Sequence, residues 1–203
     1  MRHWLSGAIA VASLGIAGSA ALAEQTEAPA ANPQVVEKIR AAGAAVSPLA
    51  QNDPRLVIGY HLTLGEKATD EQLKPLAELS GDEVYALNLA GTSITNAGLA
   101  PLAKLSGLHR LHLEKTEIGD EALKHLAGLQ NLEYLNLYAT QVSDAGLEHL
   151  KGLENLKKLF VWQSQVTAAG SLKLKQALPE LAIIPDLSAE PQAAAEKPED
   201  PKP

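Results

Sequence analysis

Aliphatic residues recur through the middle of the chain with a period of 24 residues. Residues 108–131 align with residues 132–155 without a gap, and the segments on either side continue the pattern. Two columns fall on the predicted strands: Leu87, Leu111, Leu135 and Leu159, and then Leu89, Leu113, Leu137 and Val161. A hydroxyl column follows at Thr92, Thr116, Thr140 and Ser164. So many columns at one spacing predict a solenoid of stacked units.

Each unit predicts a short strand, a turn and a helix. Alternation directs Leu135 and Leu137 inward and Asn136 outward, and Leu147 and Leu150 follow at helical spacing. The expected helix N-caps are Thr95, Ser143 and Thr167. A column of small residues indicates close packing between neighbouring turns: Gly98, Ala122, Gly146 and Gly170. A looser first copy is expected at Leu62, Leu64, Leu73, Leu76 and Leu79.

The ends of the solenoid need caps, because a single unit cannot bury its own core. Asn32 and Pro33 predict the start of a helix, which Gly43 is expected to end. The expected divisions are a capping helix and loop over residues 33–56 and the repeats over residues 57–184, with a last strand at residues 181–184.

The two ends of the chain do not fit the repeat. Residues 1–23 combine a basic start, an uncharged apolar run and the small-residue site Ala21-Leu22-Ala23, which is typical of a cleaved export signal. The alternative is a membrane anchor, because the uncharged run covers 20 residues from Trp4 to Ala23. After cleavage no membrane span is expected. Residues 24–32 are expected to be a linker, and residues 185–203, rich in Pro, Ala and Glu, a disordered tail.

The composition excludes several classes of function. Lys and Arg total 17 against 24 Asp and Glu, a net charge of −7, so binding to nucleic acid through its phosphates is not expected. The chain has no cysteine, which removes disulfides, thiolate nucleophiles and cysteine-ligated metals. No cofactor is expected. Only 3% of the residues are aromatic, so the position of each ring is informative.

The repeat resembles the leucine-rich repeat in its 24-residue form. The unit that carries the resemblance is Leu132-x-x-Leu135-x-Leu137-x-x-Thr140-x-Val142-Ser143-Asp144-Ala145-Gly146-Leu147-x-x-Leu150-x-x-Leu153. Residues 177–181, Ala-Leu-Pro-Glu-Leu, are similar to the closing segment of exported bacterial proteins of this kind. The resemblance implies an α/β solenoid of about five repeats, with parallel strands on the concave side, helices on the convex side and a helical N-terminal cap. For function it implies only that such proteins usually bind other proteins. Together with the export signal, we expect a monomeric, non-enzymatic module of the periplasm, cell envelope or exterior that binds a protein or peptide.

The outward strand positions form the concave face, where a partner would bind. They fall into three columns: Ala86, Arg110, Tyr134 and Lys158; Asn88, His112, Asn136 and Phe160; and Ala90, Glu114, Tyr138 and Trp162. Because parallel strands lie roughly 4.7 to 4.9 Å apart, Tyr138 and Trp162 are expected side by side, with Lys158 close to Tyr134. The predicted ligand-binding residues are Tyr134, Tyr138, Phe160, Trp162, Lys158, Arg110, His112, Glu114 and Asn136. The alternative is that the aromatic rings only pack on one another near the C-terminal cap.

Two kinds of chemical site are not expected. His125 and His149 repeat at the same period, with Glu121 one turn before His125, but no third metal ligand is evident. His112 and Glu114 share one strand with Arg110, but no nucleophile stands beside them, and an open face does not exclude water. We therefore predict neither a metal site nor a catalytic residue.

Two other classes of function stay open. One is a structural protein of the cell envelope, which would need only the acidic solenoid and no specific ligand. The other follows from a second resemblance, to the repeats of the F-box substrate adaptors of eukaryotic ubiquitin ligases. Residues 24–56 are too short to hold the helical F-box beside the linker, and an export signal also argues against this function.

Overall fold

The computed structural model describes residues 30–61, 63–79 and 81–187. The expected signal over residues 1–23, and most of the expected linker and tail, lie outside the described residues. Within the described residues, seven strands form one sheet in their order along the chain. They are β1 (Ala45–Ala50), β2 (Asp53–Gly59), β3 (Val84–Asn88), β4 (Arg110–His112), β5 (Tyr134–Asn136), β6 (Lys158–Phe160) and β7 (Ala182–Ile184). Strands β2 to β7 are parallel, and β1 runs antiparallel to β2.

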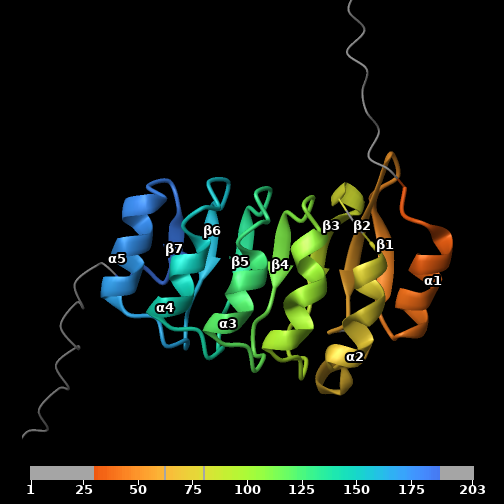
Figure 1. Ribbon diagram of the computed structural model, residues 1–203, viewed down its shortest axis with the longest axis horizontal. Helices are drawn as coiled ribbons and strands as arrows, with labels where there is room; N and C mark the ends of the chain where they lie inside the picture. Colours follow the sequence, from red (N-terminus) through yellow and green to blue (C-terminus); the bar gives the residue numbers. More distant parts are fainter. Residues whose placement is uncertain (1–29, 62, 80, 188–203) are drawn as a thin grey trace, which may run out of the picture.

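Helical segments line one face of the sheet (Figure 1). The α-helices are α1 (Pro33–Ala41), α2 (Asp70–Leu73), α3 (Asp120–Leu123), α4 (Asp144–Leu147) and α5 (Ala168–Ala177). The 3₁₀ helices are η1 (Gly65–Lys67), η2 (Lys74–Glu78), η3 (Gly81–Glu83), η4 (Asn96–Lys104), η5 (Lys124–Leu126) and η6 (Glu148–Leu150). Segment η4 contains Pro101, which cannot donate a backbone hydrogen bond. We refer to the sheet face away from the helices as the concave face.

The inward columns form the core, as the repeat predicts. Leu87, Leu111, Leu135 and Leu159 pair in register across β3 to β6, and all four are fully buried. The hydroxyl column lies beside them, with Thr92, Thr116 and Thr140 buried and Ser164 half-buried. The hydroxyl groups of Thr92, Thr116 and Thr140 donate to the carbonyl oxygens of Leu89, Leu113 and Leu137 at 2.6, 2.6 and 2.8 Å. Each threonine therefore donates a hydrogen bond to a carbonyl of the turn that follows its strand.

The first copy of the repeat lies earlier in the chain than we predicted. Ile58 pairs with Leu87, 29 residues later, which is five more than the regular 24. Ile58 and Tyr60 are fully buried, whereas Leu64 is only half-buried in the turn; Leu62 lies outside the described residues. Leu73, Leu76 and Leu79 are buried as expected, and the expectation was wrong for Leu64 because the longer first copy breaks the period. The Tyr60 hydroxyl donates to the carbonyl oxygen of Gln72 at 2.9 Å, and burial raises the pKa of Tyr60 to about 12.

The N-terminal cap consists of a helix and a strand. The Asn32 side chain accepts a hydrogen bond from the backbone N–H of Gln34, and Pro33 begins α1, as expected. Gly43 follows the helix with φ at +96°, a backbone conformation that glycine adopts without steric cost. Residues 45–50, which we expected to form part of a loop, are β1. No alternating apolar pattern marks this strand, because its side chains are exposed or half-buried.

Aspartates connect successive copies on the helical side. The carboxylates of Asp70, Asp120 and Asp144 each accept from the backbone N–H and the hydroxyl of one residue in the next copy: Thr95, Ser143 and Thr167, respectively. The donor–acceptor distances are 2.6 to 2.8 Å. Only Ser143 and Thr167 also accept from the backbone as helix caps; Thr95, predicted to do so, makes no cap bond in the structure.

The small-residue column makes room for these carboxylates. A Cβ atom on Gly98, Gly146 or Gly170 would lie 2.1 to 2.5 Å from the Oδ1 atom of the aspartate in the preceding copy. Ala122 occupies the same position where the preceding copy has Asn96 instead of aspartate. The repeats are thus held by packing, by strand pairing and by these bonds between copies. The fold is an α/β leucine-rich repeat solenoid with parallel strands on one side and helical segments on the other.

Candidate binding surface on the concave face

Strand pairing aligns the outward residues in the predicted columns. Across β3 to β7 one column is Ala86, Arg110, Tyr134, Lys158 and Ala182, and the next is Asn88, His112, Asn136, Phe160 and Ile184. The third column continues past the strand ends, where the N–H of Lys115 donates to the carbonyl of Tyr138 at 2.8 Å and that of Ala139 to the carbonyl of Trp162 at 2.9 Å. Ala182 and Ile184 were missed by sequence reasoning, although they lie 24 residues after Lys158 and Phe160.

Tyr134 lies at the centre of the aromatic cluster. Its ring centroid is 5.2 Å from that of Phe160 on one side and 4.8 Å from that of His112 on the other. The guanidinium carbon of Arg110 is 5.7 Å from the Tyr134 centroid, within the range of a cation–π interaction. Burial and the charge of Glu114 raise the pKa of Tyr134, against the opposite effects of Arg110 and Asn136. Tyr134 is therefore held on two sides by rings.

Tyr138 and Trp162 lie on neighbouring copies but are placed differently. The ring of Tyr138 lies under the ammonium group of Lys115, whose Nζ is 5.9 Å from the centroid. Trp162 is 56% exposed, and Ile184, next to Phe160 across the strands, is 39% exposed. Among the ring contacts of the described residues, Tyr138 and Trp162 do not form a stacked pair. The two residues lie on adjacent turns of neighbouring copies, and the Tyr138 ring contacts Lys115.

Glu114 is the ionisable residue with the most constrained surroundings on this face. His112 Nδ1 donates to Glu114 Oε1 at 3.2 Å. Burial raises the pKa of Glu114, but the bonds from His112 and from the backbone, together with His61 nearby, outweigh it, so the pKa is below its ordinary value. Glu114 Oε2 and His61 Nδ1 are both buried and lack hydrogen-bond partners within the described part of the chain.

Asn136, the remaining polar residue among those predicted to bind a ligand, supports the backbone. Asn136 Oδ1 accepts from the backbone N–H of Tyr138 at 3.0 Å, and Asn88 makes the same bond to the N–H of Ala90 at 3.0 Å. The side chain of Asn136 therefore orients the turn that carries Tyr138. Asn136 is half-buried, in keeping with this structural role.

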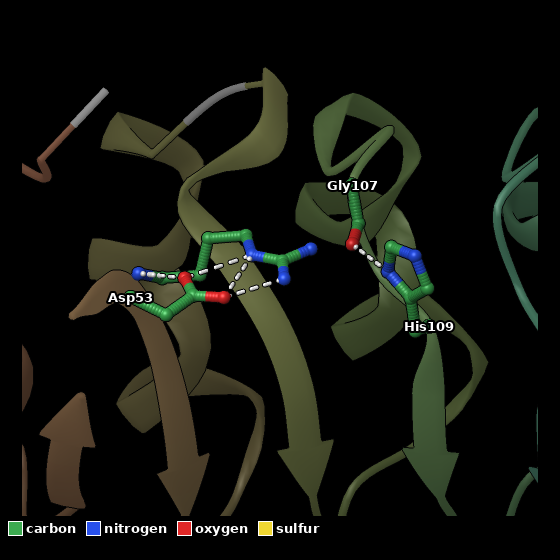
Figure 2. Close-up of polar contacts among 4 residues, drawn as sticks. Asp53, Gly107 and His109 are labelled. Carbon is green, nitrogen blue, oxygen red and sulfur yellow. Dashed lines mark hydrogen bonds and ion pairs between the residues drawn. The ribbon is translucent and has the colours of Figure 1, made fainter. Parts of the chain in front are cut away.

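Sequence reasoning also missed a further row of side chains, which lies near the N-terminal ends of β2, β3 and β4. The Arg55 guanidinium lies 4.9 Å from the ring centroid of Tyr85, and the Tyr85 ring is stacked on His109 at 4.6 Å. Asp53 fixes Arg55 through two oxygen atoms, and His109 Nδ1 donates to the carbonyl of Gly107 at 2.6 Å (Figure 2). Tyr85 and His109 are 24 residues apart, so the period alone could have revealed the stack.

Other parts of the described chain offer less to a ligand. A cavity of about 200 Å³ lies beside the C-terminal turn, lined by Leu156, residues 177–181 and Glu154. Pockets for small molecules have volumes of about 300 to 1,000 Å³, so this cavity is small for that purpose. His125 and His149 are half-buried, and no group of three metal-ligating side chains was found in the described residues. The same residues contain no helix that is long and apolar enough to cross a membrane.

Comparisons with known proteins identify similar folds. No protein-family model and no curated protein matches the chain. A leucine-rich repeat protein of Leptospira interrogans is 19% identical, with 54% of this chain and 26% of that chain covered and a TM-score of 0.43. Internalin C2 of Listeria monocytogenes is 24% identical, with 57% and 65% covered and a TM-score of 0.38. The leucine-rich repeat ectodomain of the receptor kinase SOBIR1 of Arabidopsis thaliana is 15% identical, with 68% and 83% covered and a TM-score of 0.45.

The chain spans less than two thirds of the length of the first two of these proteins. The register of the strands and the buried columns of this chain are those of a leucine-rich repeat solenoid.

Proposed function

We propose that the protein is a monomeric, non-enzymatic binding module, exported to the periplasm, the cell envelope or the exterior. In this proposal it recognises a protein or peptide partner through the C-terminal half of its concave face. The observation that carries the proposal is the exposure of large apolar side chains there: Trp162 is 56% exposed and Ile184 39%. Both border Phe160, which contacts Tyr134. In the N-terminal half of the same face, the matching outward positions carry the smaller side chains of Ala86, Asn88 and Ala90, and the Tyr85 ring is held between Arg55 and His109.

Burial of exposed rings is a common source of binding energy. Trp and Tyr give a large contact area at low entropic cost and are enriched among residues that dominate protein interfaces. Packing within the protein explains Tyr134 and Phe160, whose rings contact each other. It does not explain why Trp162 and Ile184 stay accessible. A structural protein without a ligand would have no use for this uneven distribution, and an F-box adaptor would need a module for which residues 24–56 have no room.

The test is to identify the partner and then to truncate the exposed ring. A photo-reactive residue in place of Ile184 would be used to crosslink the partner in the native envelope. The affinity of that partner for the Trp162→Ala variant should fall by at least about 2 kcal/mol, or roughly 30-fold. Asn88→Ala is the control on the N-terminal half and should cost well under about 1 kcal/mol.

Melting temperatures measured on the same variants separate binding from packing. Because Trp162 is more than half exposed, its truncation should change the melting temperature little. An unchanged affinity together with a large loss of thermal stability would show that the ring serves packing alone. The export part of the proposal is tested by N-terminal sequencing of the exported protein, which should begin at Glu24; a chain that still begins at Met1 would support the anchor instead.

A further inference from the structure

Two basic side chains flank Tyr134 on the concave face. Strand pairing places Arg110 on one side of Tyr134 and Lys158 on the other, and both are exposed. The Arg110 guanidinium leans over the Tyr134 ring at 5.7 Å. With a strand spacing of roughly 4.7 to 4.9 Å, the backbones that carry the two cations are about 9 to 10 Å apart. We refer to Arg110, Tyr134 and Lys158 together as the basic strip.

Among the described residues the cations of the basic strip have no ion-pair partner, although the chain is acidic overall. Most other basic residues in the described ranges pair with a carboxylate: Lys38, Arg40, Arg55, Lys74, Lys124, Lys151, Lys157 and Lys175. No ion pair of the described residues includes Arg110 or Lys158. Two carboxylates lie nearby, but Glu133 is bonded to Lys157 at 2.7 Å and Glu114 to His112. The strip is therefore a basic surface on a chain with a net charge of −7.

We propose that the basic strip binds an acidic, extended segment of the partner protein. This inference rests on the proposed function and specifies the chemistry of the partner. A segment in the polyproline II conformation rises about 3.1 Å per residue with three residues per turn, so carboxylates three positions apart share one face, roughly 9 Å apart, and match the separation of the two cations. Arginine binds carboxylates through a planar, two-pronged contact, which favours Arg110 for one of them. Apolar side chains of the same segment then lie on Phe160, Trp162 and Ile184.

The charge distribution favours a peptide over a nucleic acid. Binding to nucleic acid draws on many phosphate contacts, and the strip offers two cations beside a patch of exposed apolar side chains. Carboxylates next to leucine or aromatic residues would match both parts of this surface. The two parts can be tested separately, because removing the charges of the strip leaves the apolar patch intact.

The experiment uses the full mature chain and three fluorescein-labelled peptides that repeat Glu-Leu-Pro, Gln-Leu-Pro or Lys-Leu-Pro, so that the charged or polar residue recurs at every third position. We refer to them as the Glu-Leu, Gln-Leu and Lys-Leu peptides. Fluorescence anisotropy should show that the Glu-Leu peptide binds at least about tenfold more tightly than the other two. The double variant Arg110→Gln and Lys158→Gln should lose about tenfold in affinity for this peptide. The matched control is the double variant Lys67→Gln and Lys104→Gln, which changes the net charge equally at two exposed lysines of η1 and η4 that no ion pair of the described residues includes. It should retain affinity within about twofold.

The possible results distinguish this inference from the proposed function. One result is that the Glu-Leu and Gln-Leu peptides bind with equal affinity and that both lose this affinity in Trp162→Ala. That result would overturn the inference that the segment is acidic, while the concave face would remain a binding surface. Equal losses in the two double variants would show a general charge effect and would also overturn the inference. Single-stranded DNA would be added as a competitor at the same concentration of negative charge. If it displaces the Glu-Leu peptide, the basic strip binds polyanions in general, and the inference of an acidic protein segment is overturned. Failure of the proposed function would be seen independently, as Trp162→Ala leaving the affinity of the crosslinked partner unchanged.

Discussion

The carboxylate of Asp120 occupies the space that a Cβ atom on Gly146 would need. Such a Cβ would lie 2.5 Å from Asp120 Oδ1 and 3.1 Å from the Asp120 Cα. The carboxylate cannot move aside freely, because it accepts the backbone N–H and the hydroxyl of Ser143, both at 2.7 Å. One missing side chain thus allows a charged bond between two copies of the repeat.

Replacement of Gly146 by alanine should therefore destabilise the protein, despite the better helix propensity of alanine. We expect a loss of about 1 to 3 kcal/mol in the free energy of unfolding, the usual cost of overpacking. Gly128→Ala is the matched control: no atom lies within 4 Å of its Cβ position. The control should be neutral or stabilising by up to about 1 kcal/mol. Urea denaturation of both variants measures the difference, and equal effects would contradict the steric role of Gly146.

The bond between Asp144 and Thr167 should make the stability of the solenoid sensitive to acid. Burial raises the pKa of Asp144, but the hydrogen bonds from Thr167 and the charge of Lys173 outweigh it, so the pKa is below its ordinary 3.8. A depressed pKa contributes stability that is present above the unfolded pKa and is lost as the pH falls through the folded pKa. Asp144→Ala should cost about 1 to 2 kcal/mol at pH 7.

The difference between the wild type and Asp144→Ala should stay constant from neutral pH to about pH 5 and shrink below about pH 4. Asp144→Asn should lose less at pH 7, because Asn96 performs the same role in its own copy, where Oδ1 accepts the N–H of Gly119 at 2.7 Å. Denaturation series at several pH values measure these differences. A gap that persists unchanged at pH 3 would show that the charge of Asp144 is not involved.

The turn after each strand holds a residue with a left-handed backbone. The column comprises Gly91, Lys115, Ala139 and Gln163, with φ between +52° and +62°. This conformation costs a non-glycine residue about 1 to 2 kcal/mol, and glycine loses about 0.5 to 1 kcal/mol in flexibility on folding. Ala139→Gly should therefore stabilise the protein by up to about 1 kcal/mol. Gly91→Ala, the reverse change in an open position, should destabilise it by a similar amount. Thermal unfolding measures both, and shifts of the same sign would contradict the argument.

The strand register predicts opposite consequences for two neighbouring residues of β5. Leu135 is fully buried, so Leu135→Ala should cost about 2 to 5 kcal/mol. Asn136 faces outward but bonds the N–H of Tyr138, so Asn136→Ala should cost about 1 kcal/mol rather than nothing. Equal losses in chemical denaturation would show that the two side chains do not face opposite sides of the sheet.

The repeat period was sufficient to predict the strand register and the inward columns, because every regular copy places equivalent residues 24 positions apart. It failed where that spacing changes: Ile58 lies 29 residues before its partner Leu87. It could not reveal β1, whose side chains are largely outside the core. The alignment of Tyr134 with Lys158 followed from the period, but the engagement of Tyr138 by Lys115 depends on side-chain rotamers. The same holds for the unpaired atoms of His61 and Glu114, since His61 belongs to the irregular first copy.

The gap-free match between residues 108–131 and 132–155 makes the length of the recognition surface adjustable. A duplicate of residues 132–155 would contain the three residues that connect neighbouring copies. They are the hydroxyl donor Ser143, the acceptor Asp144 and Gly146, which leaves room for the aspartate of the preceding copy. The insertion would add a further Tyr-Asn-Tyr row to the concave face while the antiparallel β1 still closes the N-terminal end. Evolution or design could thus lengthen this molecule by one 24-residue copy at a time, because each added copy brings the same core residues.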